Sequence, residues 1–248
     1  MTAPFPTRAQ EVWRYADLEA LKPVWDQLGD VATLVVGPGE SLERVWVPSG
    51  EAVQVRRVRV ALGEGARARL FALNTASDYG RVEVEVTMAA DADFALYGAN
   101  IGGGGSNNEF VTTVRHEGTS GRSRQTVRSV LGGKAVGSYL GKVEVARGAQ
   151  QTDGEQSVKA MLLDRGATAN CKPELEIYAD DVKCAHGASV GELDPQQLFY
   201  AAARGLDPAT ARAVLLEGFV MGLWDEISDE ALRTQIADAA RTALRAVV

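Results

Sequence analysis

A short phrase that ends in Gly-Ala recurs along this chain and constrains its fold more than any other feature. The copies are residues 60–66, 143–149, 161–167 and 182–188, with a decayed copy at 86–92. Each copy alternates apolar residues, which indicates a β-strand, and closes on a glycine that favours a turn. The last three of these glycines are 18 and 21 residues apart, a spacing typical of one coil of a solenoid.

Stacked coils place equivalent positions above one another, so the phrase predicts continuous columns of side chains. The first apolar column would contain Val60, Val143, Met161 and Val182, and the second Leu62, Val145, Leu163 and Cys184. We therefore predict a mainly β fold, a parallel β-helix. At about 20 residues per coil it would have about eight coils. We expect a short N-terminal helical cap at 1–30, the β-helix at 31–191 and a C-terminal helical subdomain at 192–248.

Both ends of the chain carry helix signals. Trp13 and Trp25 lie in an N-terminal stretch with a predicted helical turn, which would cover strand edges at an open end of the solenoid. Asp194 and Asp207 each precede a proline, which is the order of a capping acid and a favoured first helical residue. Ser228 opens the last predicted helix.

Charge and composition argue against several function classes. The formal net charge is −7, which disfavours nucleic acid as the main partner because phosphate contacts need a basic surface. No stretch of about 18 apolar residues predicts a membrane span, and residues 1–10 do not resemble a secretion signal. The two cysteines form no disulfide framework and suit a reducing compartment. We therefore expect a soluble, cytoplasmic protein.

One long motif follows the third copy of the phrase. Residues 172–191 read Lys-Pro-Glu-Leu-Glu-Ile-Tyr-Ala-Asp-Asp-Val-Lys-Cys-Ala-His-Gly-Ala-Ser-Val-Gly, and residues 197–200 and 204–205 continue it. This signature resembles the SufB/SufD family of iron-sulfur cluster assembly proteins, and its SufD branch most closely. Residues 6–18 also resemble the family, with Ala16 where Thr is usual. The chain is shorter than usual SufD members, so we expect fewer coils.

The resemblance implies a right-handed β-helix that acts as a non-catalytic scaffold of the Suf complex. It implies that the C-terminal coils pair with a SufB-like paralogue and that a SufC-like ATPase docks on the helical subdomain. It also implies that His186, in Lys-Cys-x-His-Gly, helps to form a nascent cluster site at the SufB interface. A cluster needs about four ligands, so a transient iron-sulfur cluster would be shared with the partner and the isolated chain would hold no cofactor.

Cys184 and His186 are the candidate metal ligands, and the repeat places them in different columns. Cys184 falls in the second apolar column, which favours a small buried hydrophobic residue. His186 falls in the polar column of Glu64, Arg147 and Arg165. A histidine there would face water or a partner and could bind metal as neutral imidazole. A plain surface hydrogen bond is the alternative for His186.

Other polar residues carry weaker predictions. Cys171 is expected to be incidental, and His116 to be a loop histidine. Glu174 and Glu176 alternate with apolar residues and share one strand face. Paired carboxylates invite comparison with polysaccharide-active β-helix enzymes, which is the alternative function. This strand lacks the aromatic platforms that bind sugars.

Two surfaces are predicted to meet partners. The dimer interface would include Glu174, Glu176, Tyr178, Lys183 and His186. Because unpaired strand edges seek partners, the isolated chain is expected to form a homodimer.

The ATPase would dock on Phe219, Met221 and Trp224, since apolar residues at neighbouring positions cover more than one helix face. The glycine-rich stretch 102–108 lacks the ending of a nucleotide-binding loop, so it predicts a wide turn, and ATP hydrolysis would come from the separate chain.

Overall fold

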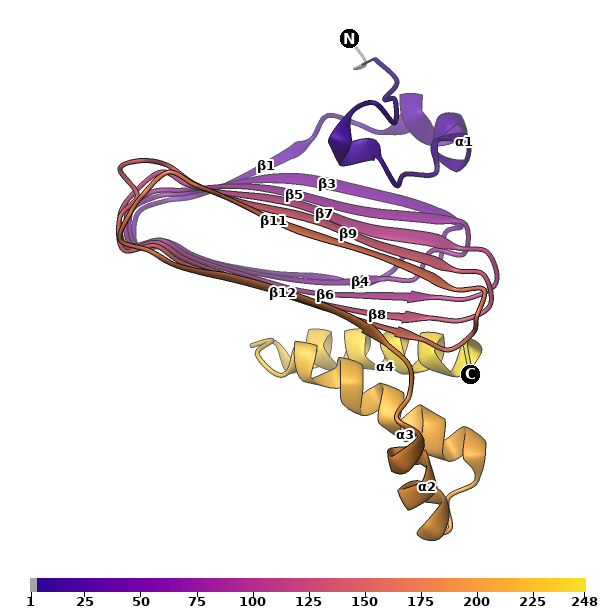
Figure 1. The fold of residues 1–248 in the computed structure, drawn as a ribbon. Coiled ribbons are helices and arrows are strands. Elements are labelled where there is room, and N and C mark those ends of the chain that lie inside the picture. Colours follow the sequence, from indigo (N-terminus) through magenta and orange to yellow (C-terminus); the bar gives the residue numbers. More distant parts are fainter. Residues whose placement is uncertain (1–3) are drawn as a thin grey trace.

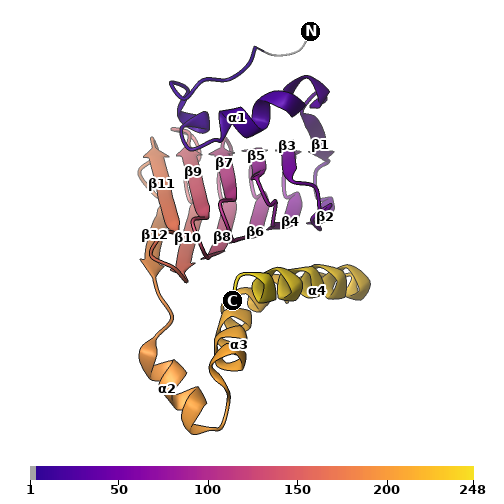
Figure 2. The same ribbon diagram turned by 90° about the vertical axis from the view of Figure 1, so that its right-hand side faces the viewer.

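The computed structural model describes residues 4–248 and shows a parallel β-solenoid of about 6 turns. Its strands form two 6-stranded parallel sheets that face each other (Figures 1 and 2). The odd sheet has the order β1-β3-β5-β7-β9-β11, and the even sheet has the order β12-β10-β8-β6-β4-β2. Each turn, or rung, contributes one strand to each sheet. The predicted fold class is confirmed.

The elements are bounded as follows. The strands are β1 (Ala32–Val36), β2 (Ser41–Trp46), β3 (Val53–Leu62), β4 (Arg67–Asn74), β5 (Tyr79–Met88), β6 (Asp93–Gly102), β7 (Asn107–His116), β8 (Arg122–Leu131), β9 (Val136–Val145), β10 (Asp153–Leu162), β11 (Thr168–Ile177) and β12 (Lys183–Gly191). The helices are η1 (Glu11–Trp13), α1 (Leu18–Leu21), η2 (Lys22–Gln27), α2 (Pro195–Ala203), α3 (Pro208–Val220), η3 (Met221–Trp224) and α4 (Glu230–Ala246).

The rungs are longer than the sequence repeat predicts. Side chains that bond across neighbouring rungs are 26 residues apart at Arg57 and Glu83, and 32 apart at Ser138 and Asn170. A rung of this kind holds two strands of about ten residues and two corners. The prediction of about eight coils with about 20 residues each is therefore wrong. The glycine-rich stretch is a turn between β6 and β7, as predicted.

The copies of the phrase occupy three different places. Copies 60–66, 86–92 and 143–149 stack at one corner, where the chain leaves the odd sheet. Copy 161–167 lies at the opposite corner, after β10. Copy 182–188 lies mostly inside β12, so Gly187 is a strand residue rather than a turn residue. The two glycine spacings therefore do not measure a coil.

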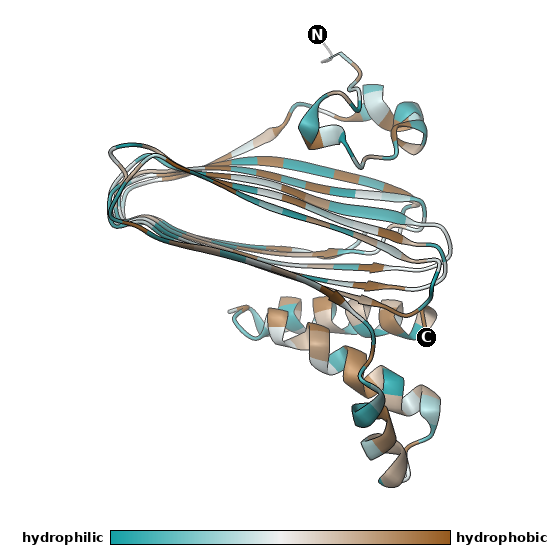
Figure 3. Ribbon diagram, in the orientation of Figure 1, coloured by the Kyte–Doolittle hydropathy of each residue, from teal (hydrophilic) through white to brown (hydrophobic). Residues whose placement is uncertain are grey.

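The core lies between the two sheets. Val60, Val86, Val114 and Val143 stack in register along the odd sheet and are at most 2% exposed. Successive residues of a strand point to opposite faces, so every second side chain enters this core. Figure 3 shows the resulting alternation of polar and apolar positions along the strands.

The N-terminal segment (residues 4–28) lies across the outer face of the odd sheet (Figure 2). Trp13 and Leu21 pack with Tyr79 of β5, and Asn107 of β7 donates a hydrogen bond to the carbonyl oxygen of Tyr15. The prediction that this segment covers strand edges at an open end is wrong. Its aromatic side chains find more apolar surface on the outer face of β3 and β5.

Helices α3 and α4 cover the outer face of the even sheet (Figure 1). Leu216 of α3 and Ile236 and Leu244 of α4 share one buried cluster with Phe71 of β4 and Val130 of β8. Helix α2 stands apart and buries none of its side chains. Asp194 and Asp207 accept hydrogen bonds from backbone N–H groups of the first turns of α2 and α3, as predicted. Across residues 4–248, no helix combines the length and apolar character needed to cross a membrane.

Candidate functional site

The solenoid ends in a C-terminal rung formed by β11 and β12. Each is the last strand of its sheet, and within residues 4–248 neither has a strand neighbour on its outer edge. Unpaired backbone N–H and C=O groups therefore line both edges. The motif of residues 172–191 lies almost wholly on these two strands and the corner between them.

Three side chains of this rung continue columns that point into the core. Cys171 is in register with Tyr139, Cys184 with Gly154, and His186 with Gln156. Tyr139 and Gln156 are each 1% exposed, so these columns face inward. No further rung covers them, which leaves both cysteines half-buried and His186 exposed. The mouth of the solenoid therefore presents two thiols and an imidazole.

The predicted columns of both candidate ligands are wrong. Cys184 follows Phe94, Ser123 and Gly154 rather than Leu62, Val145 and Leu163. His186 follows Leu96, Gln125 and Gln156 rather than Glu64, Arg147 and Arg165. The cause is that copy 182–188 opens a strand, whereas the other copies close one. His186 is thus exposed because its rung is the last one, although its column points inward.

The two thiols are free and lie against the edge of the core. Burial raises the pKa of Cys171. Burial also raises the pKa of Cys184, although a hydrogen bond from the Gly154 backbone opposes this shift. A bound cation would favour the thiolate form of either side chain. Among the described residues, no three His, Cys, Asp or Glu side chains come together as a metal site.

A ladder of buried polar side chains leads to His186 from inside the solenoid. Gln156 donates from Nε2 to the Tyr139 hydroxyl at 2.9 Å, and that hydroxyl donates to Oε1 of Gln125 at 3.2 Å. Thr112 lies 3.4 Å from the same hydroxyl. Sequence reasoning missed these residues because Gln125 and Gln156 lie among other polar residues of β8 and β10, and nothing local shows that they point into the core. The in-register columns alone relate them to His186.

The outer face of the C-terminal rung carries ion pairs. Lys172 Nζ lies 3.1 Å from Glu174, and Lys142 Nζ lies 2.8 Å from Glu176. Both acids are thus neutralised by lysines on the same sheet, an arrangement that does not favour acid-base cleavage of sugars. Tyr178 is 63% exposed and Lys183 is also exposed. The predicted dimer interface is therefore open, and its role stays a prediction.

The three residues predicted to dock an ATPase face the solenoid of their own chain. Trp224 is 1% exposed within the cluster of α3, α4 and the even sheet. Phe219 and Met221 are half-buried against that cluster. The chain changes from α3 to the tighter turns of η3 at Met221, which redirects consecutive apolar side chains toward one surface. The side chains left exposed here are Phe199 at 76%, Tyr200 at 61% and Val214 at 55%.

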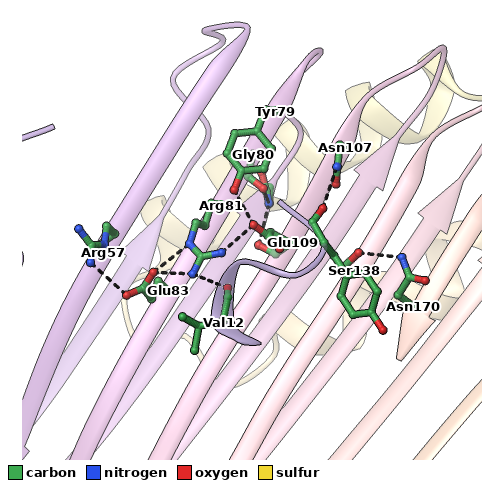
Figure 4. A network of polar contacts seen from close by, with 12 residues as sticks. Val12, Arg57, Tyr79, Gly80, Arg81, Glu83, Asn107, Glu109, Ser138 and Asn170 are labelled. Carbon is green, nitrogen blue, oxygen red and sulfur yellow. Dashed lines mark hydrogen bonds and ion pairs between the residues drawn. The ribbon is translucent and has the colours of Figure 1, made fainter. Parts of the chain in front are cut away.

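A buried ionic cluster, which sequence reasoning missed, lies beneath the N-terminal segment (Figure 4). Arg81 is fully buried, lies 2.7 Å from both Glu83 and Glu109, and donates to the carbonyl oxygen of Val12 at 2.9 Å. Its guanidinium group is 3.7 Å from the centre of the Trp13 ring. Tyr79 donates to Glu109 at 2.5 Å, and burial together with this carboxylate raises the pKa of Tyr79. The cluster fixes the N-terminal segment on the odd sheet.

His116 is also buried, so the loop assignment is wrong. It is the last residue of β7, 1% exposed, and its Nε2 lies 2.9 Å from the hydroxyl of Ser123. Burial lowers its pKa to about 4. It contributes to the interior and lies away from the mouth of the solenoid.

Most of the chain is similar to a known protein family. Residues 28–219 match the model of the SufBD core domain of SUF system FeS cluster assembly. The chain belongs to the SufBD family. It is therefore a member of the SUF iron-sulfur cluster assembly system, as the resemblance predicted.

Relatives in the SufBD family include proteins named SufD. The chain is 36% identical to Escherichia coli (strain K12) SufD over 125 residues, which are 50% of this chain and 30% of the relative. It is 27% identical to Bacillus subtilis (strain 168) SufD over 210 residues, 84% of this chain and 47% of the relative. A SufBD family protein of Synechocystis sp. is 30% identical over 180 residues, 72% of this chain and 40% of the relative. The chain thus spans less than half the length of these relatives.

Proposed function

We propose that this chain is a non-catalytic scaffold subunit whose C-terminal rung carries part of an iron-sulfur cluster site. One observation carries the proposal, namely that Cys171, Cys184 and His186 occupy inward columns at an uncovered mouth of the solenoid. Thiolate is the usual protein ligand of iron-sulfur clusters, and imidazole is an occasional one. The cluster is the cargo of the assembly system.

A partner subunit would complete this site. The mouth offers at most three ligands, whereas a cluster takes about four. A SufB-like paralogue with its own solenoid could pair edge to edge with β11 or β12, because their free backbone groups accept a further strand. The exposed Tyr178 and the ion-paired Glu174 and Glu176 would flank that contact. Without the paralogue, a second copy of the chain could use the same edges, giving the homodimer.

The ATPase would dock on the C-terminal helices. We move the proposed contact from Phe219, Met221 and Trp224 to the exposed Phe199, Tyr200 and Val214. Phe199 and Tyr200 are large, exposed neighbours on α2, a helix that buries none of its side chains. Such an exposed pair is typical of an interaction surface. Both cysteines are unpaired, which suits assembly in a reducing compartment such as the cytoplasm.

The decisive experiment is anaerobic cluster reconstitution of the complex with its SufB-like and SufC-like partners. We expect the cluster absorption per complex to fall in the His186→Ala variant and, by a smaller amount, in Cys184→Ala. Lys159→Ala, on the neighbouring strand β10 with its side chain on the outer face, is the matched control. Co-purification of both partners must be unchanged in these variants. Equal absorption in His186→Ala and wild type would remove His186 from the site.

A second variant separates docking from cluster binding. Phe199→Ser should lower the amount of ATPase that co-purifies and leave the SufB-like partner bound. Full recovery of the ATPase would reject the proposed surface on α2.

A further inference from the structure

The polar ladder beneath the mouth of the solenoid has one unused acceptor. Gln125, Tyr139 and Gln156 are each at most 1% exposed. Two hydrogen bonds join them through the Tyr139 hydroxyl. Oε1 of Gln156 has no hydrogen-bond partner among the described residues. Leaving a buried acceptor without a donor is destabilising, so a donor is expected close to this atom.

The direction of the hydrogen bonds fixes the orientation of the Gln156 amide. The single hydroxyl proton of Tyr139 goes to Oε1 of Gln125, so the hydroxyl must accept from Gln156. Only the Nε2 end of that amide can donate, and it does so at 2.9 Å. Oε1 of Gln156 is therefore held away from Tyr139 and remains an acceptor.

On the mouth side of Gln156, His186 is the first side chain of this column that can donate a hydrogen bond. On the inner side, the Gln125 amide donates no hydrogen bond to Gln156. It is in register with Gln156 on the next strand, and neighbouring strands are about 4.8 Å apart. Both residues line one shallow groove at the edge of the even sheet, together with Val158 and Ala188. Val158 and Ala188 are apolar. The groove's other possible donors, Ser157, Lys159 and Ser189, alternate with Gln156 and His186 along the strands and so point to the opposite face of the sheet. The His186 ring is exposed, so it is free to turn toward Gln156.

We propose that Gln156 is a positioning residue for His186. Its Oε1 accepts a hydrogen bond from one ring N–H of His186, which leaves the opposite ring nitrogen unprotonated and directed to the mouth of the solenoid. A histidine that binds metal commonly donates its other N–H to such an acceptor, which fixes the tautomer and the ring orientation. The link between Gln156 and His186 stands on geometry alone, whereas its use in cluster binding rests on the proposed function.

Nuclear magnetic resonance of the full chain tests the link directly. The chain has only two histidines, so a long-range ¹H–¹⁵N spectrum of histidine-labelled protein contains two imidazole patterns. At pH 8, His186 should show one predominant tautomer. Averaged shifts typical of two exchanging tautomers in the wild-type chain would overturn the proposal without any variant.

Two matched variants separate positioning from folding. Gln156→Met keeps the side-chain length but removes the acceptor, and should convert His186 to a mixture of tautomers. Lys159→Met changes an exposed side chain on the outer face of the same strand and should leave His186 in one tautomer. The His116 pattern reports an intact core in both. If the two variants affect His186 equally, or neither affects it, Gln156 does not position the ring.

The complex with the SufB-like partner supplies a separate readout. Gln156→Met should lower the affinity for the cluster about tenfold or more, and Lys159→Met should not. A tautomer effect without a cluster effect would keep the positioning role and contradict the proposed cluster site. A cluster effect without a tautomer effect would overturn the positioning role.

Discussion

The two histidines compare the interior of the solenoid with its mouth. His116 and His186 both lie on strands and both face inward, yet one is 1% exposed and the other is open to solvent. His116 has a hydroxyl partner and further rungs on either side. His186 has only the rung beneath it. Position along the stack, rather than local sequence, separates a structural imidazole from one available to a ligand.

The same contrast applies to charge. Beneath the N-terminal segment, Arg81 is matched by Glu83 and Glu109 and sealed by Trp13. On the C-terminal rung, Lys172 and Glu174 form an exposed pair. Buried pairs are costly to break, and exposed pairs contribute little. Substitutions in the interior should therefore change stability, and substitutions at the mouth should change function.

The largest expected loss of stability follows from breaking the buried ionic cluster around Arg81. Arg81→Met leaves the Glu109 carboxylate buried without its cation, which should lower the free energy of unfolding by about 3–5 kcal/mol. Urea denaturation measures this loss. The double variant Arg81→Met with Glu109→Gln should recover part of it. Arg59→Met, which breaks an exposed pair with Glu85, is the control and should cost at most about 1 kcal/mol. Similar losses at both arginines would contradict the contrast.

The next effect is a dependence of stability on pH. His116 has a folded-state pKa of about 4 and an unfolded value of about 6.5, so between these values the unfolded chain binds more protons. Its contribution is complete above about pH 6.5 and is lost as the pH falls toward 4, by about 3 kcal/mol in all. Urea denaturation across this range should show a shallower decline for His116→Gln than for wild type. Parallel curves would show that His116 is not buried in its neutral form.

The smallest effects come from a matched pair of glycines. At Gly118, a Cβ would lie 2.1 Å from the backbone nitrogen of Ala90, whereas at Gly187 nothing lies within 4 Å. Gly118→Ala should therefore cost about 1–3 kcal/mol, because backbone must move. Gly187→Ala should change the free energy of unfolding by no more than about 0.5 kcal/mol. A large loss at Gly187 would mean that the C-terminal rung is already packed against something in the isolated chain.

Much of the fold could be predicted from the sequence because its signals are local. Alternating strands, the apolar columns of the odd sheet and the capping acids Asp194 and Asp207 depend on neighbours in sequence. The family motif located the C-terminal rung. Rung length could not be predicted, because the same phrase recurs at both corners and within β12. Gly-Ala lies at a corner in copies 60–66, 143–149 and 161–167 but inside β12 in copy 182–188. The dipeptide alone therefore does not locate a corner.

The remaining errors concern contacts between distant segments. Arg81 and Glu83 alternate with valines and resemble a solvated face, and only the docking of Trp13 shows that they are buried. Trp224 resembles a partner contact until α4 and the even sheet enclose it. The orientation of His186 depends on strand register. The misaligned phrase placed it in an outward, polar column, whereas the pairing of β10 with β12 places it in the inward column of Gln156.

Both terminal segments tie together rungs that are remote in the stack. Lys172 of β11 donates a hydrogen bond to Glu11 of η1. Ser228, just before α4, donates one to Glu43 of β2. An array in which each repeat touches only its neighbours can fray from either end. Here each end of the stack is bonded to a segment from the opposite end of the chain, so melting should proceed as a single cooperative transition in which the free edges of β11 and β12 stay formed until the whole solenoid unfolds.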